Sequence, residues 1–291
     1  MRLSGHKKKM FNKPLNQFVG VAAGQMASLR ITPEDFTLVG IKLNLSGTTF
    51  DKTKIDRVRI KIGAKVIWDL TYAQLNKINN YKNAADNANY LYIDFAERDQ
   101  AIFPVKEIGG LDLMSLLPVG EVYVEVYIAA TAIAPRIDAT GYFERTQNNP
   151  FVLKFLPFSW NQAASGRFTL PLQFRGSLLK RVWLYYTGTD WVGNTAGNVE
   201  RVEVKKNGLV IFDQKCNDNR FDQSNYKKVP QSNLFVVDFL VDNNHDAHIQ
   251  TIRNTKSGQI FDAFEFNAYL KDGGGSTVTA IAEVLDTPTN L

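Results

Sequence analysis

The sequence is poor in the residues on which most enzymes and secreted proteins rely. It has one cysteine, Cys216, in 291 residues, so no internal disulfide can form and a buried, inert thiol is expected. It has only three histidines and no Gly-x-Ser-x-Gly, phosphate-binding glycine loop or zinc-ligand spacing. These absences argue against the common hydrolase, nucleotide-binding and zinc-dependent sites.

Long apolar runs are also missing. The longest uncharged stretch near the middle, Val126–Pro135, is much shorter than the roughly 20 residues that span a bilayer. At the start, Lys7–Lys9 are followed by FNKPLNQF rather than by the apolar core of a secretion signal, so none is predicted. With 44% hydrophobic and 12% aromatic residues, the chain can nevertheless form the cores of two domains.

The net charge of +5 is confined to the beginning of the chain. Residues 1–13 contain five basic side chains and no acidic one, whereas the remainder carries 29 of each sign. The sequence therefore predicts a neutral body with a basic arm, residues 1–14. Such an arm would be attracted to anionic lipid, at about 1 kcal/mol per basic residue, and equally to nucleic acid. The predicted contact residues are Arg2, Lys7, Lys8, Lys9 and Lys13.

The chain contains an internal repeat. Ile55–Asp69 (IDRVRIKIGAKVIWD) aligns without a gap with Val199–Asp213 (VERVEVKKNGLVIFD), 144 positions later. The same offset aligns Asn89–Phe95 (NYLYIDF) with Asn233–Phe239 (NLFVVDF). Two separate blocks that match at one offset predict two tandem copies of one domain.

The patterning within each copy is typical of β-structure. Apolar and polar residues alternate along Val58–Ile62 and Val122–Ile128, and Asn207-Gly208 separates two such runs as a hairpin turn does. Many short strands in a domain of this size favour a jelly roll. The predicted fold is all-β, with two tandem eight-stranded jelly rolls at residues 15–149 and 150–291 and short helical insertions.

One helical insertion is predicted in the first copy. Thr71 and Gln74 have the spacing of a capping box, and Tyr72, Leu75 and Ile78 would form one apolar face. The second copy reads CNDNRFDQSNYKKVP at this place, which is more polar and predicts at most a weak helix.

The candidates for a metal site lie in one polar segment. Asp242, His245, Asp246 and His248 have side chains that bind metal ions, and the two aspartates with Asn243 could hold a structural calcium ion. Their spacing matches neither an EF-hand nor a zinc motif, so a polar loop between strands is the favoured interpretation. Beyond this calcium hypothesis we predict no cofactor, and we assign no catalytic residue.

Two pairs of aspartates recur in both copies, Asp69 with Asp213 and Asp94 with Asp238. Aspartic proteases also place one aspartate on each of two lobes, but their Asp-Thr-Gly or Asp-Ser-Gly loops do not occur here. Residues kept in both copies are expected to support the shared fold, for example by accepting backbone N–H groups in turns. For Trp183, core packing is the favoured role.

With its tandem jelly rolls, basic arm and lack of a catalytic set, the chain resembles the double-jelly-roll major capsid proteins of tailless, membrane-containing icosahedral phages, of the corticovirus-like or flavobacterial lipid-containing type. The resemblance covers residues 15–291 and rests on the repeats and the arm. It implies a structural coat protein, not an enzyme, whose homotrimers have a pseudo-hexagonal outline and tile the shell. It further implies neighbouring trimers, minor capsid and vertex proteins, and an inner membrane as partners, in a virion assembled in the host cytoplasm.

Two other functions stay open at this point. A secreted glycan-processing amidase also has two jelly rolls and would use acidic residues and tryptophans between the lobes. The missing secretion signal, the single cysteine and the basic arm argue against it. A carbohydrate-binding protein would expose aromatic residues on one sheet, and Trp191 is the best candidate for such a contact.

Overall fold

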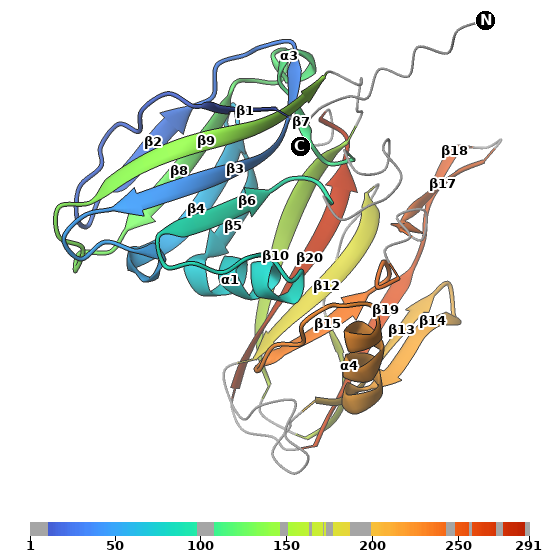
Figure 1. Ribbon diagram of the computed structural model, residues 1–291. Helices are drawn as coiled ribbons and strands as arrows, with labels where there is room; N and C mark the ends of the chain where they lie inside the picture. Colours follow the sequence, from blue (N-terminus) through green and yellow to red (C-terminus); the bar gives the residue numbers. More distant parts are fainter. Residues whose placement is uncertain are drawn as a thin grey trace, which may run out of the picture.

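A computed structural model shows two β-sandwich lobes in tandem (Figure 1). The structure describes residues 11–97, 108–145, 151–162, 165–170, 172, 177–186, 199–242, 248–255, 258–271 and 276–288. We define residues 11–145 as the first lobe and residues 151–288 as the second lobe. In the described part of the chain, no helix is long and apolar enough to cross a membrane.

The first lobe consists of two antiparallel sheets. Its elements are β1 (Phe11–Pro14), β2 (Met26–Arg30), β3 (Phe36–Ser46), the 3-10 helix η1 (Lys52–Lys54), β4 (Ile55–Ile62), β5 (Lys65–Thr71), α1 (Tyr72–Tyr81), β6 (Tyr90–Asp94), β7 (Leu111–Asp112), α3 (Leu113–Leu116), β8 (Val122–Ile128) and β9 (Arg136–Arg145). One sheet has the order β1-β9-β3-β6, with β7 joined to β3, and the other has the order β2-β8-β4-β5.

The second lobe repeats this plan. Its elements are β10 (Val152–Gln162), β11 (Gly166–Leu170), β12 (Leu178–Tyr186), β13 (Val199–Lys206), β14 (Leu209–Lys215), α4 (Cys216–Asn225), β15 (Leu234–Asp238), β16 (Ile249–Gln250), β17 (Ile252–Thr255), β18 (Gly258–Phe261), β19 (Phe264–Leu270) and β20 (Ser276–Asp286). The sheet orders are β10-β20-β12-β15, with β16 joined to β12, and β11-β19-β13-β14, and β17 and β18 form an additional ribbon. Each of the two large sheets therefore has its counterpart in the first lobe, which confirms the predicted double jelly roll.

The irregularities of the sheets recur as well. The β4–β5 pairing shifts after Ile60 and the β13–β14 pairing shifts after Val204, 144 positions later. The β3–β9 pairing has its extra residue at Val39 and the β12–β20 pairing at Lys180, 141 positions later. Because a bulge redirects a strand, matched bulges mean that the two lobes share backbone detail as well as topology.

The predicted helix and hairpin are confirmed. The Thr71 side chain accepts the N–H of Gln74, and the Gln74 side chain accepts the N–H of Thr71, so the capping box at the start of α1 is complete. At the β13–β14 turn, Asn207 and Gly208 have φ angles of 51° and 81°, the left-handed conformation that favours these two residue types.

Helix α4 is a full ten-residue helix where the sequence predicts only a weak one. The side-chain amides of Asn219 and Gln223 donate to the backbone carbonyl of Val236 at 2.9 and 3.1 Å. In the first lobe, Asn79 of α1 donates in the same way to the carbonyl of Tyr92 at 3.0 Å. In both helices, side-chain amides that bind a neighbouring strand take the place of apolar side chains on the buried face. A search for apolar periodicity does not detect such amides.

The basic arm is shorter than the sequence suggests. Residues 11–14, which the sequence assigns to the arm, form β1 and pair with β9. Phe11 packs against Phe36 and Phe143, with ring centroids 4.8 and 5.6 Å apart. These contacts anchor the chain from Phe11 onward in the first lobe.

The aspartates that recur in both copies have different roles. Asp69 binds Arg57 and Arg59 at 3.4 and 3.2 Å, and Asp213 binds Arg201, so arginine takes the place of the backbone partners suggested by the sequence. Asp238 does accept a backbone N–H, that of Leu240 at 2.9 Å.

We predict that replacing both Asn219 and Gln223 by alanine lowers the free energy of unfolding by about 1–2 kcal/mol. The buried carbonyl of Val236 would lose both amide donors, and an unsatisfied buried carbonyl costs about this much. Denaturant unfolding measures the change, with Asn217→Ala on the exposed side of the same helix as the control. Equal stability of the double variant and the control would contradict the anchoring role.

Candidate functional site between the lobes

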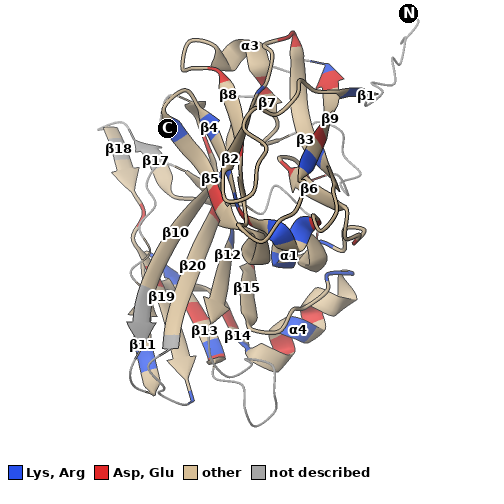
Figure 2. Cartoon of the chain, turned by 90° about the vertical axis from the view of Figure 1, so that its left-hand side faces the viewer, with Lys and Arg blue, Asp and Glu red and all other residues tan. Residues whose placement is uncertain are grey.

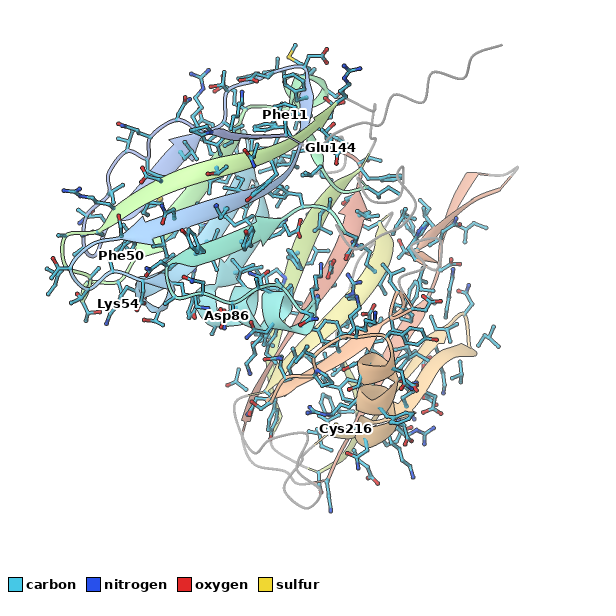
Figure 3. The ribbon with its side chains drawn as sticks, viewed as in Figure 1. Phe11, Phe50, Lys54, Asp86, Glu144 and Cys216 are labelled. Atoms are coloured by element: carbon cyan, nitrogen blue, oxygen red, sulfur yellow. The ribbon has the colours of Figure 1, made fainter. Side chains whose placement is uncertain are left out.

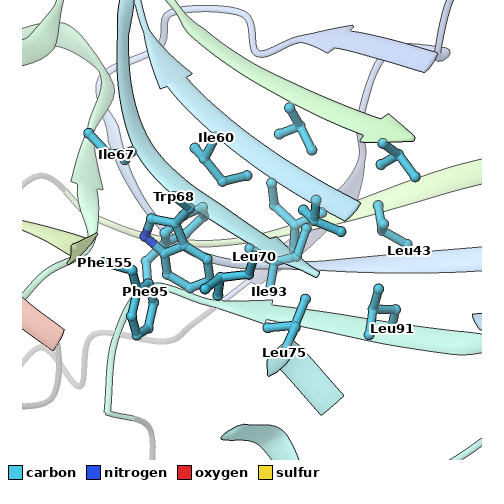
Figure 4. Close-up of a cluster of buried hydrophobic side chains, with 14 of the residues drawn as sticks. Leu43, Ile60, Ile67, Trp68, Leu70, Leu75, Leu91, Ile93, Phe95 and Phe155 are labelled. Carbon is cyan, nitrogen blue, oxygen red and sulfur yellow. The ribbon is translucent and has the colours of Figure 1, made fainter. Parts of the chain in front are cut away.

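The two lobes meet through a continuous apolar core. The indole N–H of Trp68 on β5 donates to the carbonyl of Leu153 at 2.9 Å, and its ring packs edge-on against Phe95 and Phe155 (Figure 4). The side chains of the second lobe that join the core of the first are Val152, Leu153, Phe155, Trp183, Leu234, Val236, Ile281 and Leu285. The sheet β10-β20-β12-β15 is therefore buried on both faces.

Helix α1 adds polar contacts to this interface. The hydroxyl of Tyr185 donates to the carbonyl of Gln74 at 3.1 Å, and the Lys77 ammonium donates to the carbonyl of Ser232 at 2.6 Å. The N–H of Val229, which follows α4, donates to the carbonyl of Tyr81 at 3.0 Å. Figure 2 shows α1 directly above α4 on one side of the molecule, as these bonds require.

Charged side chains from both lobes meet at the centre of the interface. We define the interlobe charge cluster as Lys82 and Glu97 of the first lobe with Lys180, Arg181, Asp238 and Glu283 of the second. Three cations face three anions, so the cluster is electrically neutral.

Arg181 is the hub of the cluster and is 0% exposed. Its Nε lies 2.9 Å from Asp238 Oδ1, and its Nη1 lies 2.6 Å from Glu97 Oε1 and 3.1 Å from Glu283 Oε1. The hydroxyl of Tyr81 donates to the second oxygen of Asp238 at 2.9 Å. One guanidinium therefore joins a carboxylate of the first lobe to two carboxylates of the second.

The two lysines complete the neutralisation. Lys180 Nζ lies 2.6 Å from Glu97 Oε1, and Lys82 Nζ lies 3.3 Å from the same oxygen and 3.4 Å from Glu283 Oε1. The indole N–H of Trp183 donates to Glu283 Oε2 at 3.0 Å.

The bulge in β12 explains how two consecutive residues reach one carboxylate. Successive side chains of a regular strand point to opposite faces of the sheet. Lys180 occupies the extra position of the bulge, which allows Lys180 and Arg181 to bind Glu97 together.

The charged forms of Glu283, Lys82 and Arg181 are favoured despite their burial. Burial alone would raise the pKa of Glu283, but the charges of Lys82, Arg181 and Lys180 outweigh it and lower that pKa to about 2. Burial likewise opposes the charge of Lys82 and Arg181, yet the neighbouring carboxylates raise the pKa of both cations. These carboxylates serve as ion-pair partners, and their burial and pairing do not suit proton transfer to a substrate.

A pocket of about 300 Å³ opens beside the cluster, on the first lobe. It lies between the segment that follows α1 and the strand β6. Its lining residues are Asn79, Lys82, Asn83, Ala84, Ala85, Tyr92, Asp94, Ala96 and Glu97.

The metal candidates are only partly within the described residues. Asp242 is exposed in a turn, and His248 is partly buried just before β16. His245 and Asp246 lie outside the described residues. Among the residues that the structure describes, no group of three or more His, Cys, Asp or Glu side chains could hold a metal ion. The calcium hypothesis stays a prediction.

The candidates for membrane or genome contact also lie partly within and partly outside the described residues. Lys13 lies on β1, pairs with Glu34 and places its ammonium 5.0 Å from the ring centre of Phe143, so it belongs to the folded lobe. Arg2 and Lys7–Lys9 lie outside the described residues. Trp183 and Cys216 are buried, as the sequence predicts, and Trp191 falls outside the described part.

The charge cluster is the feature that sequence reasoning missed. Its members come from separate segments, and Lys82 and Glu283 are 201 positions apart. A signal was nevertheless present, because Lys180-Arg181 and Glu283 interrupt strands that are otherwise apolar, LLKRVWLYY and AIAEVLD. Charges on fully buried strands require partners, although the sequence does not identify them.

Several solved structures with a similar fold come from viral shells. The chain superimposes on the major capsid protein P2 of bacteriophage PM2 with a TM-score of 0.77 and 17% identity, covering 96% of this chain and 98% of that one. For the major capsid protein of Sulfolobus turreted icosahedral virus the TM-score is 0.64 at 13% identity, with 96% and 97% covered. For the PBCV-1 virus capsid it is 0.62 at 10% identity, with 95% and 93% covered. At such identities the superpositions show a shared fold.

Sequence comparison with family profiles goes further. The profile described as viral coat protein P2 N-terminal domain matches residues 12–144, and the profile described as viral coat protein P2 C-terminal domain matches residues 152–288. No curated protein sequence matches the chain at a significant level. The two profiles match in tandem and together cover almost the whole chain, which therefore belongs to the viral coat protein P2 family and is a structural major capsid protein.

Proposed function

We propose that three copies of this chain form a pseudo-hexagonal ring, that such rings tile an icosahedral shell over an internal membrane, and that the basic arm contacts this membrane. As a coat protein, the chain lies in the virion and assembles with itself into the capsid. The equal sheet orders of the two lobes carry the proposal, because three chains then provide six similar lobes. Minor capsid and vertex proteins complete the shell in this proposal, and assembly takes place in the host cytoplasm, in keeping with the single, buried Cys216.

The position of the chain ends supports an inner location for the arm. Phe11 pairs with Phe143 where β9 ends, and Val152 pairs with Asp286 where β20 ends. The start of β1 therefore lies beside the end of β9, and the start of β10 lies beside the end of β20. Figure 3 shows Phe11 at one end of the first lobe and Phe50 at the other. In the proposal the Phe11 end faces the membrane, because the preceding residues 1–10 carry four basic side chains and no acid.

The interlobe charge cluster supports the use of the chain as a rigid building block. A shell requires that the two lobes keep one relative orientation, and an apolar contact alone fixes orientation weakly because burial is not directional. Arg181 adds directional bonds to Glu97 of one lobe and to Asp238 of the other. Sliding of the lobes would leave buried charges without partners, at a cost of about 3–5 kcal/mol.

We predict that Glu283→Gln lowers the free energy of unfolding at pH 7 by about 3–5 kcal/mol, because it leaves buried cations without one of their counter-charges. The pKa of Glu283, about 2 in the fold, is below its ordinary value. Its stabilising contribution is therefore present above the ordinary pKa of about 4.3 and is lost as the pH falls through about 2. Denaturant unfolding across this range should show the two proteins converging.

The matched control is Glu121→Gln, which removes the exposed ion pair with Arg30. Exposed pairs contribute little, so the control should lose less than about 1 kcal/mol. A loss for Glu283→Gln no larger than that of Glu121→Gln would contradict the locking role of the cluster.

We predict that the purified chain is a stable trimer at micromolar concentration. Three copies with six similar lobes close a ring, which removes the exposed faces that a single chain would present. Size-exclusion chromatography with light scattering measures the mass directly. A monomer under these conditions would count against the trimeric shell unit.

We predict that deletion of residues 1–10 leaves the fold and the trimer intact and abolishes binding to anionic liposomes. The deletion stops before β1 because Phe11 packs in the first lobe. Liposome flotation measures binding, and vesicles of neutral lipid and free DNA serve as alternative targets. Unchanged flotation of the truncated protein with anionic vesicles would refute the membrane role of the arm.

A further inference from the structure

Three oxygen-bearing side chains lie in a row across three neighbouring strands of the first lobe. Thr37 on β3 pairs with Asp112 on β7 and, on its other side, with Glu144 on β9. The next residues along the three strands pair in the same register and lie in the core: Leu111, Leu38 and Phe143. Because successive side chains of a strand point to opposite faces, the row faces away from that core. We define Asp112, Thr37 and Glu144 as the oxygen row, and Figure 3 shows Glu144 at the same end of the lobe as Phe11.

The oxygen row is buried, and two of its oxygens have no partner. Asp112, Thr37 and Glu144 are 2%, 0% and 3% exposed. In the part of the chain that the structure describes, neither Thr37 Oγ1 nor Glu144 Oε2 has a hydrogen-bond partner. Asp112 accepts the N–H and the hydroxyl of Ser115 at 3.3 and 2.8 Å, and a carboxylate has room for further bonds. Buried carboxylates are normally paired with a cation or bound to a metal ion, so this arrangement points to a cation.

The basic side chains of the same sheet do not neutralise the oxygen row. The strands β1, β9, β3, β6 and β7 carry four of them. Lys13 is paired with Glu34, and Lys42 lies against the ring of a tyrosine on β6. Arg136 is at the other end of β9, and Arg145 is exposed and points to the opposite face from its neighbour in the row. The cation must therefore come from outside this sheet.

The second lobe shows that the fold itself does not require these carboxylates. The same three places on β16, β12 and β20 are held by Gln250, Leu178 and Leu285, which pair in the same register. Two leucines and a neutral amide therefore suffice to form this corner of a jelly roll. The two carboxylates and the hydroxyl of the first lobe are an addition to the shared backbone, and they serve a purpose that the second lobe lacks at this place.

The spacing of the row suits a calcium ion. Adjacent strands are about 4.8 Å apart, so the backbones of β7 and β9 lie about 10 Å apart with β3 between them. An aspartate and a glutamate that lean toward Thr37 from either side leave about 5 Å between their carboxylates, which is twice the usual Ca–O distance of about 2.4 Å. Two carboxylates and a hydroxyl form an all-oxygen set, which favours a hard cation such as Ca²⁺ over zinc.

We propose that Asp112, Thr37 and Glu144 bind a calcium ion in the first lobe. The ion joins β7, β3 and β9 where β1 begins, and water and backbone carbonyls complete its shell of about six to eight oxygens. This site is separate from the segment of Asp242, which the sequence suggests for calcium. All three ligands belong to one chain, so the inference goes beyond the proposed shell unit and does not depend on the trimer.

The first test measures binding by isothermal titration calorimetry on the full chain after dialysis against a chelator. We expect a single Ca²⁺ site per chain in the first lobe, with Mg²⁺ bound more weakly because it demands a smaller, octahedral shell. Glu144→Gln keeps the shape of the side chain and removes its charge, so it should weaken the affinity for Ca²⁺ at least about tenfold. The matched control is Glu121→Gln, which changes an exposed glutamate paired with Arg30 and should leave the affinity unchanged.

The second test, thermal unfolding, separates ion binding from a purely structural role. The Tm of the wild-type chain should rise with Ca²⁺ concentration, whereas the Tm of Glu144→Gln should hardly respond, because only binding to the folded state stabilises it. In chelator the order should reverse. Glu144→Gln and Thr37→Val should then be at least as stable as the wild type, since each removes a buried oxygen that has no partner among the described residues.

Three results would overturn the proposal. The first is a wild-type chain that binds no Ca²⁺ at millimolar concentration. The second is unchanged affinity in Glu144→Gln together with lost affinity in Asp242→Asn, which would place the ion in the segment of Asp242. The third is a lower Tm of Glu144→Gln than of the wild type in chelator, which would show that the carboxylate has a partner within the chain. None of these measurements depends on whether the chain forms a trimer or meets a membrane.

Discussion

The architecture depends on one sheet, β10-β20-β12-β15, that is buried on both faces. One face lines the core of the second lobe, and the other completes the core of the first. The charges on this sheet must be neutralised where they are, and Glu97 and Lys82 of the first lobe supply part of that neutralisation. Removing one partner of a buried ion pair is far more costly than forming the pair is favourable. The cluster therefore contributes more to a unique orientation of the lobes than to overall stability.

A fixed pair of lobes simplifies the construction of a shell. Forming a ring from six separate lobes takes five association steps, each of which costs translational and rotational freedom, whereas three fused pairs need only two. The duplicated backbone preserves the same faces on both lobes, down to the bulges at Val39 and Lys180. The side chains at equivalent positions of the two lobes differ according to whether the position is buried or exposed. Trp68 of the covered edge strand corresponds to Phe212 of the open one, and the buried Val236 corresponds to the partly exposed Tyr92.

The repeat was predictable from sequence because it lies on β4–β5 and β13–β14, where the alternation of side chains and the turn are both constrained. Helix α1 was predictable from its capping box, whereas α4 was not, since Asn219 and Gln223 bind a carbonyl rather than form an apolar face. The charge cluster joins residues up to 201 positions apart, and no local pattern encodes such a pairing. The sequence nevertheless contained an indication that one sheet is buried on both faces. NLFVVDF lacks the alternation of NYLYIDF, and a continuous apolar strand indicates two buried faces.

The central claim is that two like lobes, locked at one angle by the interlobe charge cluster, form the repeating unit of the shell. An electron cryomicroscopy map of the assembled protein tests it most directly. The account predicts rings of six similar lobes from three chains, with the two lobes of every chain in one relative orientation. Rings that do not contain three chains, or lobes that take several relative orientations, would contradict it.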